Sequence, residues 1–151
     1  MNIRVDLSGF RMDEAIEKIR AGMEKGVEDG CELIKKAAMQ NLRGDPRGAH
    51  LMSSIQTQVQ AAGLTVTGAV GVGAATGIDG EAGENFGIYV HEGTGIYSRT
   101  GMGRQDVPWF YEDAEGNGHL TSGMASNPFL ENAYNSEGQK VAQLIAEAIS
   151  G

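Results

Sequence analysis

Residues 13–43 read DEAIEKIRAGMEKGVEDGCELIKKAAMQNLR, and this stretch decides the fold. Asp13 and Glu14 suit the predicted start of a helix, and Gly44 followed by Pro46 supplies its stop. Apolar side chains recur along it every three or four positions, as on one face of an amphipathic helix. They are Ile16, Ile19, Met23, Val27, Cys31, Ile34, Ala38 and Leu42. The sequence therefore predicts one long helix of roughly 45 Å.

Three glycines lie at four-residue spacing on this predicted helix: Gly22, Gly26 and Gly30. Each costs about 1 kcal/mol in a helix interior relative to alanine. They either let a neighbouring element pack closely or mark a bend, and we favour close packing.

Downstream of this helix the chain has the alternation typical of strands. Residues 54–60 and 64–72 predict an antiparallel pair with one wet face. A third strand is predicted over residues 88–92. Residues 107–112, which contain Trp109, Phe110 and Tyr111, predict a hairpin with residues 119–121 across a glycine-rich turn.

The last part of the chain predicts a closing helix. Asn127 and Pro128 are a helix-capping residue and a first-turn proline, and apolar residues recur from Phe129 to Ile149. The whole pattern predicts a single α+β domain over residues 1–151. In it a long N-terminal helix and a C-terminal helix pack on an antiparallel sheet of four to five strands, with long glycine-rich loops between elements.

The net charge of −8 belongs entirely to the second part of the chain. Residues 1–50 hold nine basic and nine acidic side chains, whereas residues 51–151 hold three basic and eleven acidic ones. Nucleic-acid binding through phosphates requires clustered Lys and Arg, and the only basic pair is Lys35 and Lys36. Direct binding to DNA or RNA is therefore not expected. No apolar run predicts a signal peptide or a membrane span, so we expect a soluble cytoplasmic product.

Two loops invite a search for ligand sites. The glycine-rich run at residues 71–77 follows a predicted strand, but its third glycine is one place late and no amphipathic helix follows. Asp79, Glu81 and Glu84 offer oxygen atoms that a calcium ion could use, yet their spacing is not that of an EF-hand. A small metal-dependent binding module or enzyme built on the acidic loop stays the alternative from another functional class.

Catalytic residues are not evident from the sequence. His91 beside Glu92 is the most tempting acid–base pair, but neighbouring residues on a predicted strand point to opposite faces. Cys31 lies on the apolar helical stripe, which favours a buried small hydrophobe over a reactive thiol. We therefore expect a non-enzymatic protein without a cofactor or a metal.

Three segments, taken in order, carry a resemblance to a known family. The first is Leu51 with Ser54 and Ile55, and the second is Ile88–Thr94, which ends in Glu92, Gly93 and Thr94. The third runs from Pro108-Trp109-Phe110-Tyr111 through Leu120-Thr121 and Gly123 to Asn127-Pro128-Phe129-Leu130. Together they resemble the tail-completion and head–tail joining proteins of siphovirus-type bacteriophages, also called minor tail components.

This resemblance implies a virion structural protein that forms a ring, expected to be a hexamer, at the head–tail junction. Its expected partners are further copies of itself and the neighbouring connector, tail-tube or tail-terminator proteins. A tail-tube terminator ring is the alternative within the same structural class. The resemblance implies that assembly or interface residues lie at Glu92, Gly93, Thr94, Trp109, Phe110, Tyr111, Pro128, Phe129 and Leu130.

Two further expectations concern such a ring. The excess acid of residues 51–151 would repel DNA if part of it lines the channel. The loops at residues 73–87 and 99–106 carry little apolar area, so we expect neighbouring subunits to supply the contacts that order them.

Overall fold

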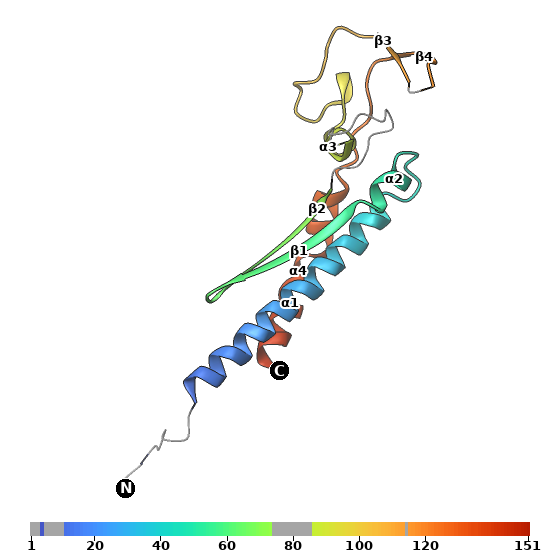
Figure 1. Cartoon of the computed structure of the whole chain (residues 1–151). Coiled ribbons are helices and arrows are strands. Elements are labelled where there is room, and N and C mark those ends of the chain that lie inside the picture. The colour runs from blue at the N-terminus through green and yellow to red at the C-terminus, as the bar shows by residue number, and fades with distance from the viewer. Residues whose placement is uncertain (1–3, 5–10, 74–85, 114) are drawn as a thin grey trace.

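The computed structural model describes residue 4 and residues 11–73, 86–113 and 115–151. Figure 1 shows two regions, and the start of α1 and the C-terminus lie at the end of the molecule opposite β3 and β4. We call α1, α4, β1 and β2 the shaft, and residues 86–124 the head. In chain order the elements are α1 (Met12–Asn41), α2 (Gly48–Met52), β1 (Ile55–Ala62), β2 (Thr65–Val72), α3 (Phe86–Glu92), a 3-10 turn (Gly95–Tyr97), β3 (Trp109–Glu112), β4 (Gly118–Thr121) and α4 (Phe129–Ser150).

The glycines of α1 form its contact with α4. Gly22, Gly26 and Gly30 are all buried, and α4 runs antiparallel along them. A Cβ atom on Gly26 would lie 2.7 Å from the Cα of Ile145, and one on Gly30 would lie 2.7 Å from Cγ1 of Val141. The predicted close packing is confirmed, because a side chain at these positions would push the two helices apart.

The hairpin β1–β2 lies along α1. Its two-residue turn, Gly63-Leu64, has Gly63 at φ +61°, as the first position of a tight hairpin turn requires. On the face toward α1, the Thr57 hydroxyl donates a hydrogen bond of 3.1 Å to the Glu32 carboxylate. The opposite face exposes Gln56, Gln58 and Gln60 and is wet. The predicted antiparallel pair is therefore confirmed.

The prediction of a third strand at residues 88–92 is wrong, because these residues belong to α3. A short apolar run has no decisive periodicity, and here tertiary packing decides. Gly87 and Val90, three positions apart, are buried together on one helical face, while Ile88 and Tyr89 are exposed. The predicted single sheet of four to five strands is also wrong, since the described strands form two separate two-stranded sheets.

The predicted aromatic hairpin is confirmed as β3–β4, and its first strand begins at Trp109 rather than at residue 107. Trp109 pairs with Thr121, and Tyr111 pairs with His119. The Asp113 carboxylate organises the turn by accepting hydrogen bonds from the amide of Asn117 at 2.7 Å and from Nε2 of His119 at 2.8 Å. The contact with His119, followed by the Asn117 amide, lowers the pKa of Asp113 to about 2.

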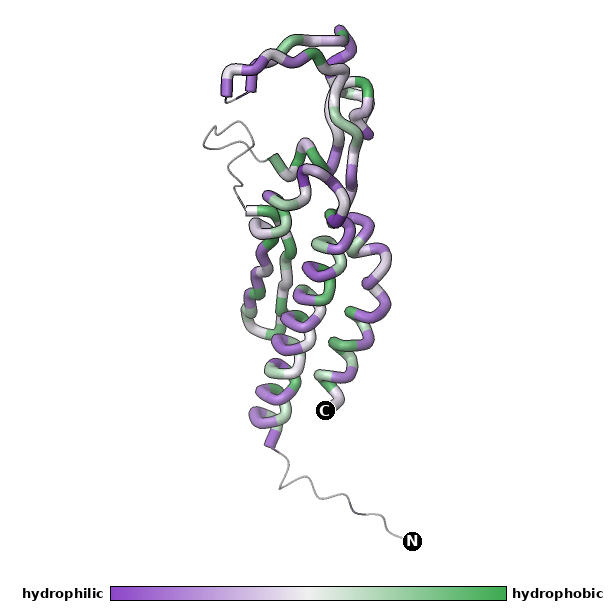
Figure 2. The backbone as a smooth tube through the Cα atoms, turned by 90° about the vertical axis from the view of Figure 1, so that its right-hand side faces the viewer, coloured by the Kyte–Doolittle hydropathy of each residue, from purple (hydrophilic) through white to green (hydrophobic). Residues whose placement is uncertain are grey.

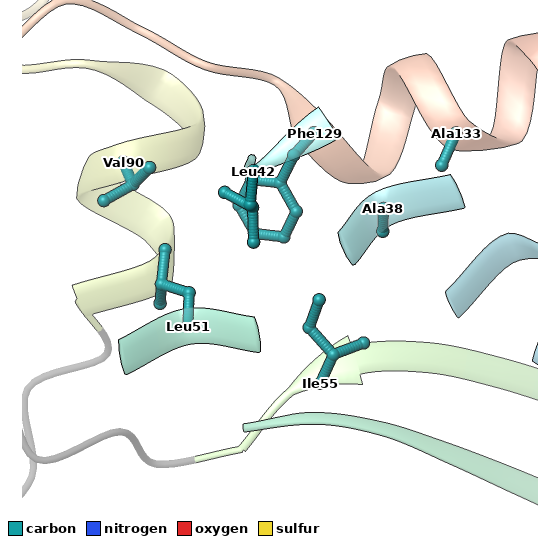
Figure 3. Close-up of a cluster of buried hydrophobic side chains, with 7 residues drawn as sticks. All are labelled: Ala38, Leu42, Leu51, Ile55, Val90, Phe129 and Ala133. Atoms are coloured by element: carbon teal, nitrogen blue, oxygen red, sulfur yellow. The ribbon is translucent and has the colours of Figure 1, made fainter. Parts of the chain in front are cut away.

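The main hydrophobic core lies where the head meets the shaft. Figure 3 shows side chains from α1, α2, β1, α3 and α4 converging there. Phe129, Leu42, Leu51 and Val90 are the largest fully buried members. In Figure 2 the head extends beyond the ends of the two long helices, on the side opposite the C-terminus. The core members are Ala38, Leu42, Leu51, Ile55, Val90, Phe129 and Ala133.

Candidate functional site

The turn after α3 joins two of the segments that carry the family resemblance. The amide of Thr94 donates to the carbonyl of Met124 at 2.9 Å, and the amide of Met124 donates to Oγ1 of Thr94, also at 2.9 Å. The amide of Ile96 donates to the carbonyl of Ser122 at 3.2 Å. Residues 94–96 thus clasp residues 122–124, although about 30 positions separate them in the chain.

Glycine is required at this clasp. Gly93 has φ +76°, and a Cβ atom there would lie 2.6 Å from the carbonyl oxygen of Tyr97. Gly95 at φ +60° approaches Gly123 so closely that an added Cβ would lie 2.9 Å from the Cα of Gly123. The chain therefore turns sharply on both sides of Thr94, directly after the helix α3.

Trp109 and Tyr111 lie on the inner face of the head hairpin. With Phe86, Thr94 and Met124 they line a hollow of about 330 Å³. The guanidinium of Arg104 lies over the Trp109 ring, 5.3 Å from its centre, and the Tyr111 ring stacks on His119 at 5.1 Å. The aromatic side chains on the inner face are therefore partly covered by contacts within the head.

Phe110 lies on the other face of the same hairpin and has no such cover. It pairs across the strands with Leu120, and the two side chains are 65% and 72% exposed. A Cβ atom on Gly118 would lie 2.6 Å from Cε2 of Phe110, so the ring lies directly against the glycine backbone. The two side chains form an exposed apolar surface, here called the Phe110–Leu120 knob.

Pro128, Phe129 and Leu130 lie at the junction rather than on the head. Phe129 is fully buried in the main core, so its ring is not available to a partner. Leu130 is half-buried and lines a shallow cavity of about 230 Å³ with Val72 and Ile88. Of the nine residues implied by the resemblance, Gly93 and Phe129 are buried and Phe110 and Tyr111 are exposed. The other five are partly exposed.

The expectation that His91 and Glu92 point apart is wrong, because they lie on a helix and not on a strand. Nδ1 of His91 is 2.7 Å from the Glu92 carboxylate, and its ring meets the edge of Phe129 at 5.6 Å between centres. Arg99 makes ion pairs with Glu131 at 2.7 Å and with Glu92 at 3.9 Å. This cluster links α3 to the first turn of α4.

A second polar junction was missed from the sequence. The Asp45 carboxylate accepts hydrogen bonds from the Arg47 guanidinium at 2.7 and 2.8 Å and from the side-chain amide of Asn127 at 3.0 Å. The Arg47 guanidinium also donates to the carbonyl of Ala125 at 2.9 Å. Arg47, the largest influence, and Asn127 hold the pKa of Asp45 well below its usual range. Only the Asp-x-Arg spacing in a turn signals this junction, because its other members lie about 80 positions away.

The predicted cap of the closing helix is also corrected. The α4 helix begins at Phe129, Pro128 stands at its N-cap, and no side chain caps it. The Asn127 side chain instead donates to Asp45 and to the carbonyl of Asn41. Asn127 therefore ties the head-to-shaft connection to the end of α1.

The described residues hold neither a metal-binding cluster nor a membrane-spanning helix. Within residues 11–73, 86–113 and 115–151, no three His, Cys, Asp or Glu side chains gather as a metal site would require. The acidic loop at residues 79–84 and most of the glycine-rich run at residues 71–77 lie outside the described residues. No helix in that part of the chain is long and apolar enough to span a membrane. Cys31 is buried, and burial raises the pKa of its thiol.

Comparisons with known proteins add no relative. No family model, curated protein or solved structure matches this chain. The likeness to tail-completion proteins therefore rests on the three sequence segments, of which the second and third meet at the clasp of Thr94 and Met124.

Proposed function

We propose that this protein is a non-enzymatic structural subunit of a phage virion that forms a hexameric ring at the head–tail junction and completes or joins the tail. The observation that carries the proposal is the Phe110–Leu120 knob on the head. The sequence resemblance supplies the biological setting, and the exposed knob supplies a physical reason for assembly.

The knob has the properties of a preorganised binding surface. Full burial of a Phe or Leu side chain contributes about 1.5–3 kcal/mol, so leaving both exposed forgoes a sizeable stabilisation. The ring of Phe110 is held against Gly118 and pays little additional ordering cost when a partner covers it. An isolated two-stranded hairpin is also marginally stable in water, so a partner would strengthen β3–β4.

The charge distribution fits a subunit through which DNA passes without being held. Residues 51–151, which include the whole head, carry eleven acidic and only three basic side chains. Such a surface repels phosphates, and it offers no basic cluster to bind them. Appreciable DNA binding by the purified protein at physiological salt would contradict this part of the proposal.

A pair of variants tests the role of the knob. Phe110→Ser combined with Leu120→Ser removes both apolar side chains without removing a buried group. Tyr134→Ser on α4 is the matched control, since Tyr134 is 65% exposed, as Phe110 is, but lies on the shaft. Light scattering and negative-stain images, with and without the proposed connector and tail partners, measure assembly.

The proposal predicts rings for the wild-type protein and for Tyr134→Ser, and mainly monomers for the double variant. Thermal melts of the three monomers check that each remains folded. Wild-type protein that stays monomeric with every neighbour present would overturn the proposed function. Rings of unchanged stability in the double variant would remove the knob from the contact.

A further inference from the structure

The shaft hairpin is unusual in its lack of charge. Residues 51–78 contain no Asp, Glu, Lys, Arg or His, although 21% of the whole chain is charged. Both strands of the hairpin lie within this stretch, and each is eight residues long. Proteins usually protect an exposed strand edge with a charged residue, a proline or a bulge, and β1 and β2 have no charge, no proline and a continuous register.

Both long edges of this hairpin are open in the described part of the chain. The sheet contains β1 and β2 alone, and α1 covers one face of it rather than an edge. Strand groups that face outward must find water or another strand. The hairpin therefore presents two unprotected edges of equal length.

The register shows which backbone groups each edge presents. The amide of Gly73 donates to the carbonyl of Ser54 at 2.9 Å, which makes Ser54–Gly73 a hydrogen-bonded pair. Hydrogen-bonded and non-hydrogen-bonded pairs alternate in an antiparallel ladder. The further bonded pairs toward the turn are therefore Gln56–Gly71, Gln58–Ala69, Gln60–Thr67 and Ala62–Thr65. The intervening residues direct their amides and carbonyls outward. They are Ile55, Thr57, Val59 and Ala61 on β1, and Val66, Gly68, Val70 and Val72 on β2.

We infer that β2 of one copy of this protein pairs edge to edge with β1 of the next copy, so that the shaft hairpins form a continuous antiparallel sheet around the assembly. The inference rests on the proposed ring and identifies a second contact within it. The two edges differ, so their contact is heterologous, and in the proposed ring the rotation between copies closes this contact on itself. Because β1 and β2 are antiparallel within each copy, β2 of one copy and β1 of the next also run in opposite directions around such a ring.

A second copy suits these edges better than an unrelated partner. One chain supplies both edges, each with four outward amides and four outward carbonyls at the same two-residue spacing. Neither edge carries a charge that would repel its counterpart. The contact also removes the exposed edges, which would otherwise template aggregation.

Hydrogen exchange resolved by residue tests the pairing in dilute subunits and in assembled rings. The amides of Thr57, Val59 and Ala61 and of Val66, Gly68 and Val70 should slow by more than about tenfold on assembly. Those of Gln58, Gln60, Thr67 and Ala69 should be protected in both states, because they bond within the hairpin. Rings whose outward amides exchange as fast as in the free subunit would overturn this inference and leave the proposed ring standing. A protein that never assembles would overturn both.

Two adjacent alanines provide a matched pair of variants. Ala61 and Ala62 are both exposed, but the Ala61 amide faces outward and the Ala62 amide faces Thr65. Ala61→Pro should abolish rings and leave the melting temperature of the subunit nearly unchanged. Ala62→Pro should lower that temperature and impair rings less. Rings formed by Ala61→Pro as readily as by the wild type would also overturn the inference.

Discussion

The shaft and the head are stabilised in different ways. In the shaft, buried glycines bring α1 against α4 and a hairpin lies along α1. In the head, a glycine clasp and a few polar contacts fix the backbone, while Phe110 and Leu120 stay exposed. The comparison teaches that close helix packing within one chain stabilises the shaft, whereas the head hairpin leaves two large apolar side chains exposed. The two regions share one core, around Phe129.

The largest expected effect comes from breaking that shared core. Phe129→Ala should destabilise the protein by about 3–5 kcal/mol, because the ring is fully buried and its loss leaves a cavity. Chemical denaturation measures the change, with Tyr134→Ala as an exposed aromatic control expected to cost far less. Equal denaturant midpoints for Phe129→Ala and the wild type would mean that head and shaft do not depend on this core.

The next effect concerns the polar junction between the regions. Asp45→Asn should cost about 2–3 kcal/mol at neutral pH, since Arg47 then lacks its charged partner and the Asp45 side chain is only 9% exposed. The pKa of Asp45 is lowered in the folded protein, so its contribution is present above the unfolded pKa of about 4 and is lost as pH falls through the folded value.

Melts from pH 7 downward check this sign for Asp45. The stability gap between wild type and Asp45→Asn should be constant near neutrality and shrink below about pH 4. Asp106→Asn is the surface control, because Asp106 pairs with Arg104 but is largely exposed. A gap that widens in acid would contradict the junction as described.

The smallest expected effect comes from glycine substitutions that test the packing of α1 against α4 in the shaft. Gly26→Ala adds a methyl group 2.7 Å from the Cα of Ile145 and should cost about 1–2 kcal/mol despite better helix propensity. Gly138→Ala on α4 meets nothing within 4 Å and should stabilise by about 0.5–1 kcal/mol. Opposite signs in thermal melts support close helix packing, and a stabilising Gly26→Ala would contradict it.

The sequence predicted the elements whose periodicity is long or whose turn is specific. The 30-residue α1, the β1–β2 pair and the β3–β4 hairpin belong to this class. It failed at α3, where seven residues fit either a strand or a helix and burial of Val90 decides. Contacts between distant segments, such as Asp45 with Asn127, have no local pattern and could not be predicted.

The candidate site was predicted in part. The aromatic hairpin was identified, but alternation alone did not show which aromatic faces outward. The pairing of Phe110 with Leu120 and the contacts of Trp109 with Arg104 separate the exposed face from the covered one. The resemblance implied that Phe129 is an interface residue, but its side chain lies in the core. A large apolar residue at a helix start can fill an interior as well as an interface, and the sequence pattern does not distinguish the two.

The mass of the assembled particle tests the central claim most directly. Native mass spectrometry of the full chain, alone and with the proposed connector and tail partners, should give a species of about six times the 15.9 kDa subunit. The predicted result is one defined oligomer mass with no larger members of a series. Monomers under every condition, or an open series of masses without a preferred number of copies, would contradict a ring-forming subunit.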